Sequence, residues 1–177
     1  MSDTSFTTPD QQHRHRDARP MLLVLTVFIL LLDRLTKLWV EHHILQSHWI
    51  TVIPGVFRIS HVLNTGAAFS LFAESMSSLV VRDILIGFSI VAVVVVLGLL
   101  WRAGRELSTT SVALTLILAG ALGNLYDRIH YSYVIDFLAV KIYHYNWPDF
   151  NVADSAIVTG ACLLLLEIFR GQPATQE

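Results

Sequence analysis

Cysteine is almost absent from this chain, since Cys162 is the single one in 177 residues. A lone cysteine excludes an internal disulfide and a CxxC redox or zinc motif. Cys162 lies within an apolar run, where we expect burial to disfavour its thiolate, so it is a poor candidate for a nucleophile. The zinc motif HExxH is also missing, and His42, His43 and His48 have no cysteine or carboxylate at ligand spacing. We therefore expect neither a metal nor a cofactor.

Charged residues are scarce as well, at 15% of the chain against 54% hydrophobic ones, and the formal net charge is −2. Without a basic surplus we expect no nucleic-acid partner. The chain also lacks a phosphate-binding glycine loop and a nucleophile-elbow motif, so neither a nucleotide site nor a serine hydrolase is indicated. The mean hydropathy of +0.57 is too high for an ordinary soluble domain of this length. The composition predicts one integral membrane domain.

Four apolar segments are each long enough, or nearly so, to cross a bilayer as a helix, which takes roughly 20 residues. The predicted spans are residues 21–40, 84–101, 109–127 and 152–170. The first segment has an alternative interpretation as a secretory signal, because it follows a basic stretch and its apolar run before Asp33 is short. No small-residue cleavage site follows it, which favours a retained helix that continues through Asp33 and Lys37.

The distribution of arginine and lysine predicts the orientation of these spans. The two tails and the turn after the second span carry Arg14, Arg16, Arg19, Arg102, Arg105 and Arg170. The opposite loops, 41–83 and 128–151, are longer and carry only Arg58, Arg82, Arg128 and Lys141. By the positive-inside rule both termini are cytoplasmic. The membrane domain then covers residues 21–170, between a disordered N-terminal tail, 1–20, and a C-terminal tail, 171–177.

The two outer loops contain local structure of their own. Residues 50–62 alternate apolar and polar side chains around Pro54-Gly55, which predicts a short hairpin. Residues 64–75 begin with turn chemistry and continue as a partly apolar segment that we expect to lie on the membrane. The second loop is rich in aromatic residues typical of the headgroup level, at Tyr143, Tyr145 and Trp147. The expected fold class is an all-α membrane protein with four transmembrane helices, a small extracytoplasmic β-hairpin and a short interfacial helix.

Polar residues gather at the outer ends of three spans, at the i, i+3, i+4 spacing that aligns one side of a helix. The three stripes are Asp33, Thr36 and Lys37; Gly120, Gly123, Asn124 and Asp127; and Asn151, Asp154 and Ser155. Such stripes are expected to face one another rather than lipid. The simplest interpretation of Asp33 and Lys37 is an intrahelical ion pair. Asp127 and Arg128 could simply anchor the end of their helix. Asp149 could simply be a turn residue or a helix cap.

Paired carboxylates are the best source of chemistry in this chain, and Asp136 and Asp154 are the favoured pair. Two aspartates held a few ångströms apart do not both ionise easily, so one keeps its proton while the other acts as a base on water. Such a pair hydrolyses peptide bonds without a metal or a cofactor. The two residues are separated by an aromatic loop, and this spacing permits a meeting at the outer mouth of the bundle without requiring it. A purely structural role for both stays open.

The same regions carry five motifs in one order along the chain. They are "DRLTK" at 33–37, "NTGAAFS" at 64–70, "GALGNLYDRI" at 120–129, "VIDF" at 134–137 and "FNVADSAI" at 150–157. On a four-span chain of this size, the set resembles the lipoprotein signal peptidases, also called signal peptidase II. Each motif alone is weak, but the ordered set covers nearly all of the chain outside its tails.

This resemblance implies a specific activity. Members of the family are aspartic peptidases of the bacterial inner membrane. They remove the signal peptide from prolipoproteins after a diacylglyceryl group has been attached to the cysteine that becomes the new N-terminus. Asp136 and Asp154 correspond to the catalytic dyad. The outer hairpin resembles the extracytoplasmic cradle of the family. The segment after the hairpin resembles the helix next to that cradle. The expected partners are such lipidated precursors and membrane lipid, and we expect a monomer.

The resemblance also assigns supporting roles. Asn64 corresponds to a residue near the active site that contacts substrate. The neighbouring positions that shape this region are Gly66, Ala67, Phe69 and Ser70. The positions that orient the dyad or stabilise the bundle are Asp33, Lys37, Asn124, Asp127, Arg128, Asn151 and Ala153.

Two functions of other classes compete with a peptidase. A small proton-coupled carrier would use intramembrane acids as a relay, but here the acids crowd one face and the second span contributes none. A structural or adaptor subunit would use the polar stripes only to hold helices together. Isosteric changes of the two aspartates distinguish these functions from catalysis.

Overall fold

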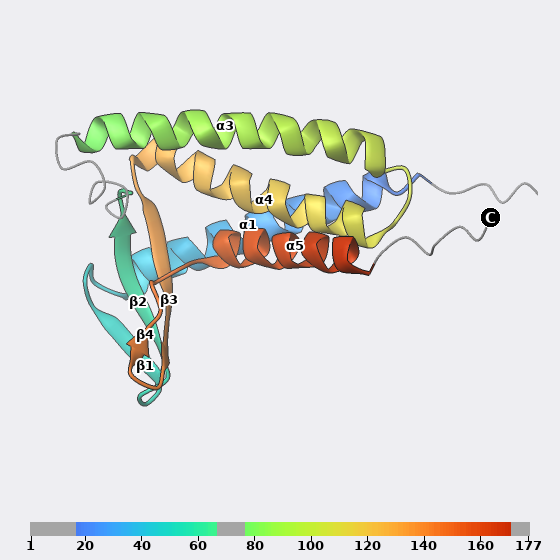
Figure 1. Cartoon of the computed structure of the whole chain (residues 1–177). Helices are drawn as coiled ribbons and strands as arrows, with labels where there is room; N and C mark the ends of the chain where they lie inside the picture. The colour runs from blue at the N-terminus through green and yellow to red at the C-terminus, as the bar shows by residue number, and fades with distance from the viewer. Residues whose placement is uncertain (1–16, 67–76, 171–177) are drawn as a thin grey trace, which may run out of the picture.

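The computed structural model describes residues 17–66 and 77–170. Its helices are α1 (Arg19–His43), α3 (Ser78–Ala103), α4 (Thr109–Tyr131) and α5 (Val152–Phe169). Its strands are β1 (Trp49–Ile53), β2 (Phe57–Asn64), β3 (Val134–Ile142) and β4 (Tyr145–Asn146). The long helices form a bundle, and the sheet projects from one end of it (Figure 1). The first residues of α1 and the last residues of α5 lie at the other end (Figure 1).

Three helices of the described residues are long and apolar enough to cross a membrane: Leu79–Ala103, Thr109–Tyr131 and Val152–Phe169. They correspond to the second, third and fourth predicted spans. The helix over the first predicted span, α1, has 25 residues and is therefore about 38 Å long. It is less apolar because it carries Asp33, Arg34 and Lys37. A crossing by α1 stays a prediction, and it depends on these charges being hidden from lipid.

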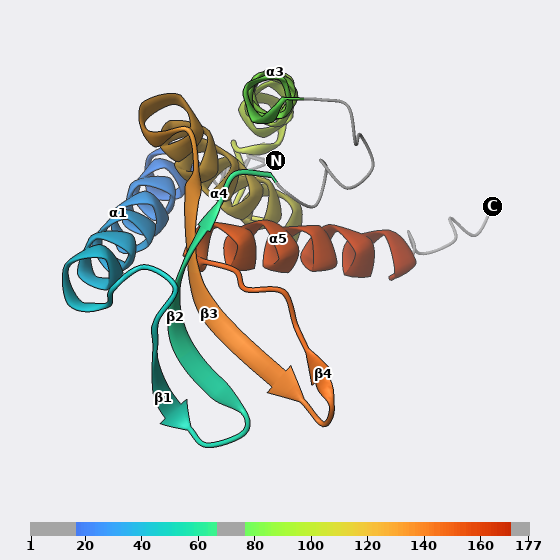
Figure 2. The same cartoon turned by 90° about the vertical axis from the view of Figure 1, so that its left-hand side faces the viewer.

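Helix α4 is the centre of the bundle, with α1, α3 and α5 around it (Figure 2). Close packing against α5 depends on glycine. A Cβ atom at Gly120 would collide with the backbone oxygen of Ala153, and one at Gly160 with that of Ala113. Small residues let membrane helices approach in this way, where apolar burial gives little driving force.

The sheet is antiparallel, with the strand order β1-β2-β3-β4. The predicted hairpin at 50–62 is present as β1 and β2, and its turn contains Gly55 at a φ of 74°. Strand β2 also pairs with β3, which places Val62 opposite Asp136 and Asn64 opposite Val134. The expected lone hairpin is thus corrected to a sheet that draws on both outer loops. Strand β3 was not expected because "VIDFLAVKI" shows little polar alternation.

A small apolar core joins the sheet to the end of α1. It consists of Val40, Ile44, Ile135 and Phe137. The predicted interfacial segment at 64–75 lies outside the described residues from position 67 onward, as do positions 1–16 of the N-terminal tail and the tail 171–177. Cys162, expected to be buried, is exposed on α5, because it lies on a face that no other described element covers.

One buried ionic cluster ties three helices together. The Lys37 side chain is 0% exposed, and its Nζ lies 2.7 Å from Asp33 Oδ2 and 2.6 Å from Asp127 Oδ2. The Asp33–Lys37 pair matches the expected i, i+4 ion pair, whereas the link to Asp127 crosses from α1 to α4. The other oxygen of Asp33 accepts a hydrogen bond of 2.9 Å from the backbone nitrogen of Ala153 on α5.

The close contact at Gly120 predicts that Gly120→Ala destabilises the bundle by about 1–3 kcal/mol, because the added methyl group overpacks the α4–α5 interface. Gly98→Ala on α3 is the matched control, since nothing lies within 4 Å of its Cβ position. Thermal unfolding of both variants in detergent micelles measures the difference. Equal midpoints for the two variants would contradict this packing.

The ionic cluster predicts that Lys37→Met destabilises the protein by about 3–5 kcal/mol, because two buried carboxylates lose their cation. The control is Lys141→Met, which changes an exposed lysine on β3. Adding Asp33→Asn and Asp127→Asn to the Lys37→Met protein should restore part of the lost stability, because the two carboxylates then carry no charge. Denaturant or thermal unfolding of the three variants and the wild type measures these differences in stability. A Lys37→Met protein as stable as the wild type would argue against the cluster.

Candidate active site

The two favoured carboxylates come from different elements. Asp136 lies on β3 and is 3% exposed. Asp154 lies in the first turn of α5, half-buried. Asn151 is the N-cap of this helix: its Oδ1 accepts a hydrogen bond from the backbone nitrogen of Asp154 at 2.9 Å. The Asp154 Oδ2 atom accepts one in return from the backbone nitrogen of Asn151 at 3.2 Å. This capping box fixes the position of Asp154.

Asn151 also connects the two aspartates. Its side chain is fully buried, and its Nδ2 donates to Asp136 Oδ1 at 2.8 Å. The same residue therefore bonds to Asp136 through its side chain and to Asp154 through its backbone and side chain. The two carboxylates, 18 positions apart in the sequence, are brought together at the junction of β3 and α5.

Two further amides complete the hydrogen bonds of this pair. Asn64 Nδ2 donates to Asp136 Oδ2 at 2.9 Å, and Asn124 Nδ2 donates to Asp154 Oδ1 at 2.7 Å. Asn64 is itself held because its Oδ1 accepts from the backbone nitrogen of Gly66 at 2.9 Å. Gly66 has a φ of 86°, a conformation that favours glycine. Each of the four carboxylate oxygens thus has a donor from a neutral group.

Asn124 links the carboxylate pair to the ionic cluster behind it. Its Oδ1 accepts from Lys37 Nζ and from Asn151 Nδ2, each at 3.3 Å. Arg128 donates to the backbone oxygen of Asn124 at 3.3 Å, and its guanidinium interacts electrostatically with both Asp154 and Asp136. Arg128 is thus held by a backbone oxygen, and no hydrogen bond from it to either carboxylate is present among the described residues.

The environment of Asp136 favours its neutral form. Burial raises the pKa of Asp136 to about 7, and the charge of Asp154 adds to this effect, while the hydrogen bonds from Asn64 and Asn151 oppose it. Near neutral pH, this carboxyl group therefore carries a proton for much of the time. A pair with one proton fits the acid and base roles of two aspartates that act on one water.

The structure does not gather every predicted residue here. Ala67, Phe69 and Ser70 lie outside the described residues. Asp149 is not the cap of α5, because Asn151 holds that position. Instead, Asp149 accepts a hydrogen bond of 2.5 Å from Ser60, which ties β2 to the chain before α5.

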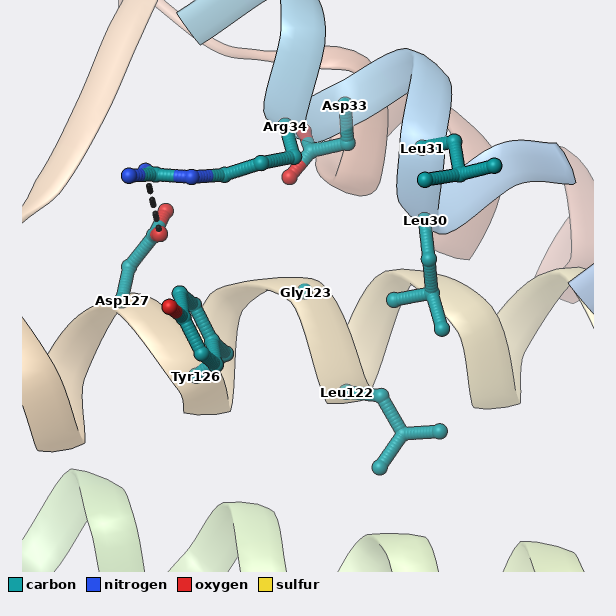
Figure 3. Close-up of a pocket in the computed structure, with 8 residues that line it drawn as sticks. All are labelled: Leu30, Leu31, Asp33, Arg34, Leu122, Gly123, Tyr126 and Asp127. Atoms are coloured by element: carbon teal, nitrogen blue, oxygen red, sulfur yellow. Dashed lines mark ion pairs between the residues drawn. The ribbon is translucent and has the colours of Figure 1, made fainter. Parts of the chain in front are cut away.

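Sequence reasoning missed Arg34, which lies inside the first motif. Its Nη2 donates to the Tyr131 hydroxyl at 2.5 Å, and its Nη1 lies 3.8 Å from Asp127 Oδ1. Figure 3 shows this pair beside a cavity of about 400 Å³ between α1 and α4. Asp33 and Asp127 line this cavity with Arg34, whereas Asp136 and Asp154 do not, so Arg34 extends the ionic cluster through its contact with Asp127. The sequence did contain a signal for Arg34, because this cation directly follows Asp33 at the polar end of α1.

Ligands for a metal do not gather in the part of the chain that the structure describes, where no three His, Cys, Asp or Glu side chains are arranged to hold an ion. The chemistry available at this site is that of two carboxylates with amide donors. Such a pair can activate water as a nucleophile and protonate a leaving group.

Comparisons of the sequence with known proteins agree on one family. The family described as signal peptidase (SPase) II matches residues 25–170. A lipoprotein signal peptidase of Solibacter usitatus is 42% identical over 142 residues, 80% of this chain and 86% of that protein. One of Pseudomonas putida is 42% identical over 159 residues, 89% of this chain and 91% of that protein. A solved bacterial membrane enzyme superimposes with a TM-score of 0.80 at 25% identity, covering 90% of this chain and all of that one. The chain therefore belongs to the signal peptidase II family of peptidases.

Proposed function

We propose that this protein is an aspartic endopeptidase of the bacterial inner membrane that removes the signal peptide from diacylglyceryl-modified prolipoproteins. It cuts just before the lipidated cysteine, and Asp136 and Asp154 activate the water. Membership of the signal peptidase II family supports the substrate class. The observation that carries the assignment of the dyad is the bonding of both carboxylates to the same buried residue, Asn151.

In the proposed mechanism the two carboxylates share one proton, which resides on Asp136, and Asp154 carries the negative charge. Asp154 takes a proton from a water molecule, whose oxygen attacks the scissile carbonyl carbon. Asp136 donates a hydrogen bond to the developing oxyanion. The C–N bond then breaks as a proton passes from the pair to the leaving amine, which Asp136 helps to protonate, and the proton that Asp154 took from the water restores the single shared proton. No covalent intermediate forms. Asn64, Asn124 and Asn151 keep the carboxylates aimed at this water.

The proposed orientation of the protein has this chemistry at the periplasmic face. All four long helices span the membrane, with both termini in the cytoplasm and the sheet outside. The arginines at 19, 102 and 105, near the end of the bundle away from the sheet, support this orientation by the positive-inside rule. The substrate enters laterally with its acyl chains in lipid. Binding of the diacylglyceryl group, remote from the reacting carbonyl, helps to position the bond.

Supporting residues fall into two groups. The group near the substrate comprises Asn64, Gly66, Ala67, Phe69 and Ser70. The group that orients the dyad or stabilises the bundle comprises Asp33, Lys37, Asn124, Asp127, Arg128, Asn151 and Ala153. The second group is supported by the continuous hydrogen bonds from Lys37 through Asn124 to Asp154. The enzyme acts as a monomer.

The contacts of the other acids disfavour a proton carrier. Asp33 and Asp127 are both held by Lys37, so they form a closed ionic cluster rather than steps of a relay. On α3, Asp83 is exposed and paired with Arg82 near the start of the helix. The described acids therefore offer no series of groups across the bilayer midplane.

The proposed dyad predicts that Asp136→Asn and Asp154→Asn each reduce cleavage of a diacylglyceryl-modified precursor by at least about 10²–10⁴-fold, the usual contribution of an acid or base. Both variants should still insert and unfold at nearly the normal temperature, because asparagine keeps the shape of aspartate. Asp83→Asn is the control, since the exposed Asp83 side chain is paired with Arg82 and bonds to neither carboxylate of the dyad. Turnover by the purified proteins in detergent measures the effect.

Two outcomes would count against this proposal. If both asparagine variants cleave at the normal rate, the mechanism is wrong. If they lose folding or assembly while the folded fraction still cleaves, the acids are structural. A precursor without the diacylglyceryl group serves as a second control, and the wild type should cleave it poorly.

The raised pKa of Asp136 predicts the pH dependence of cleavage. The protonated form is present below about pH 7 and is lost as the pH rises through 7, so kcat/KM should fall on the alkaline side with a midpoint near 7. Asn64→Leu removes a hydrogen bond that favours the charged form. The midpoint should therefore move to higher pH, even if the rate is lower. A profile without an alkaline limb, or a shift to lower pH, contradicts this assignment of the proton.

A further inference from the structure

The end of the bundle away from the sheet contains a basic cavity that the peptidase mechanism does not use. It has a volume of about 290 Å³ and is lined by Arg19, Trp101, Arg102 and Arg105. Among the ion pairs of residues 17–66 and 77–170, Arg19 pairs with Asp17 at 3.7 Å, and neither Arg102 nor Arg105 takes part in one. Three cations thus meet in one small space, and of these three only Arg19 has an ion-pair partner among the described residues.

Arg19 is held in a defined position within this cavity. Its Nη2 donates to the backbone oxygen of Trp101 at 2.6 Å, and its guanidinium lies 4.3 Å from the centre of the Trp101 ring. Its Nε is buried, with no hydrogen-bond partner among the described residues. A buried donor of a charged group without an acceptor is costly. An oxyanion is the natural acceptor for such a fixed arginine.

An apolar groove continues from the basic cavity toward the middle of the bundle. It has a volume of about 650 Å³ and shares Arg19 and Trp101 with the cavity. Most of its lining is leucine from three helices: Leu22, Leu23, Leu97, Leu100, Leu118 and Leu122. Pro20, Thr26 and Asp17 complete the lining, and Asp17 is the ion-pair partner of Arg19. The groove exists because α1 and α3 each pack along α4 without packing along each other, as their separate positions around α4 show (Figure 2).

We infer that these two spaces together bind one anionic diacyl phospholipid of the surrounding leaflet. The phosphate lies on Arg19, Arg102 and Arg105, and one acyl chain occupies the leucine groove. The ligand must be anionic at one end and apolar at the other, because the two spaces meet at Trp101. A basic pocket between transmembrane helices suits such a headgroup, and tryptophan is typical of this depth. The site is remote from the dyad and independent of the proposed catalysis.

The positive-inside rule alone offers a simpler account of these arginines. It requires only cations at this end of the helices, with no stoichiometric lipid and no contribution from the groove. The inferred site differs because it needs both the arginines and the leucine groove. A test therefore changes each part separately.

Native mass spectrometry of the full chain, purified in detergent, tests the site with equimolar dioleoyl phosphatidylglycerol and phosphatidylcholine. We expect one phosphatidylglycerol to be retained in preference to phosphatidylcholine. The double variant Arg102→Gln/Arg105→Gln should reduce this preference at least about tenfold. Arg170→Gln, at the same end of the bundle but outside the cavity lining, is the charge control and should keep the preference.

The groove is tested by Leu23→Trp, which fills it while leaving the arginines in place. This variant should lose bound phosphatidylglycerol, whereas Leu165→Trp, on an exposed part of α5, should not. Soluble glycerol phosphate should fail to displace the lipid, because it has no acyl chain for the groove. Displacement by glycerol phosphate would show a phosphate site only and would overturn the inference.

A second measurement avoids changes at the site itself. In a protein with Trp39→Phe, Trp49→Phe and Trp147→Phe, the remaining Trp101 reports on the cavity. Brominated phosphatidylglycerol should quench its fluorescence more strongly than brominated phosphatidylcholine at equal mole fraction. Equal quenching, or equal retention of both lipids by the wild type, would overturn the inference. Either failure leaves the dyad untouched, because cleavage by the asparagine variants is measured separately.

Discussion

The buried contact of Lys37 with Asp33 and Asp127 is the constraint on which the rest of this structure depends. Apolar packing alone specifies helix register weakly in a membrane, because lipid is as apolar as a leucine side chain. A lysine that is 0% exposed must keep its carboxylates, since an unpaired charge at that depth is costly. The cluster therefore sets α1 against α4, and Asp33 carries the constraint on to Ala153 at the start of α5.

The start of α5 is also where the carboxylate pair is assembled. Once α5 is held, its capping box orients Asp154, and the same Asn151 reaches the sheet to bond Asp136. The donors to both carboxylates are neutral amides. Amides orient a carboxylate without supplying a counter-charge, so burial still dominates and keeps the pKa of Asp136 near 7. An arginine in the position of Asn64 would orient Asp136 equally well but would favour its charged form.

The two ends of the bundle thus have opposite characters. Acids and amides gather where the sheet meets the helices, and arginines gather with Trp101 at the other end. The helices between them are apolar, and they leave space where α1 and α3 diverge around α4. This polarity gives the molecule one end suited to chemistry on a peptide and another suited to an anionic leaflet.

The sequence by itself determined the apolar helices, the hairpin around Gly55 and the ion pair of Asp33 with Lys37, because these depend on composition, turn chemistry and i, i+4 spacing. It also indicated Asp136 and Asp154 as candidates, without showing that they meet. Only the tertiary structure decided that β3 joins the sheet, that Lys37 reaches Asp127, and that one asparagine holds both aspartates. These contacts join segments far apart in the chain, and a local pattern records no distance between such segments.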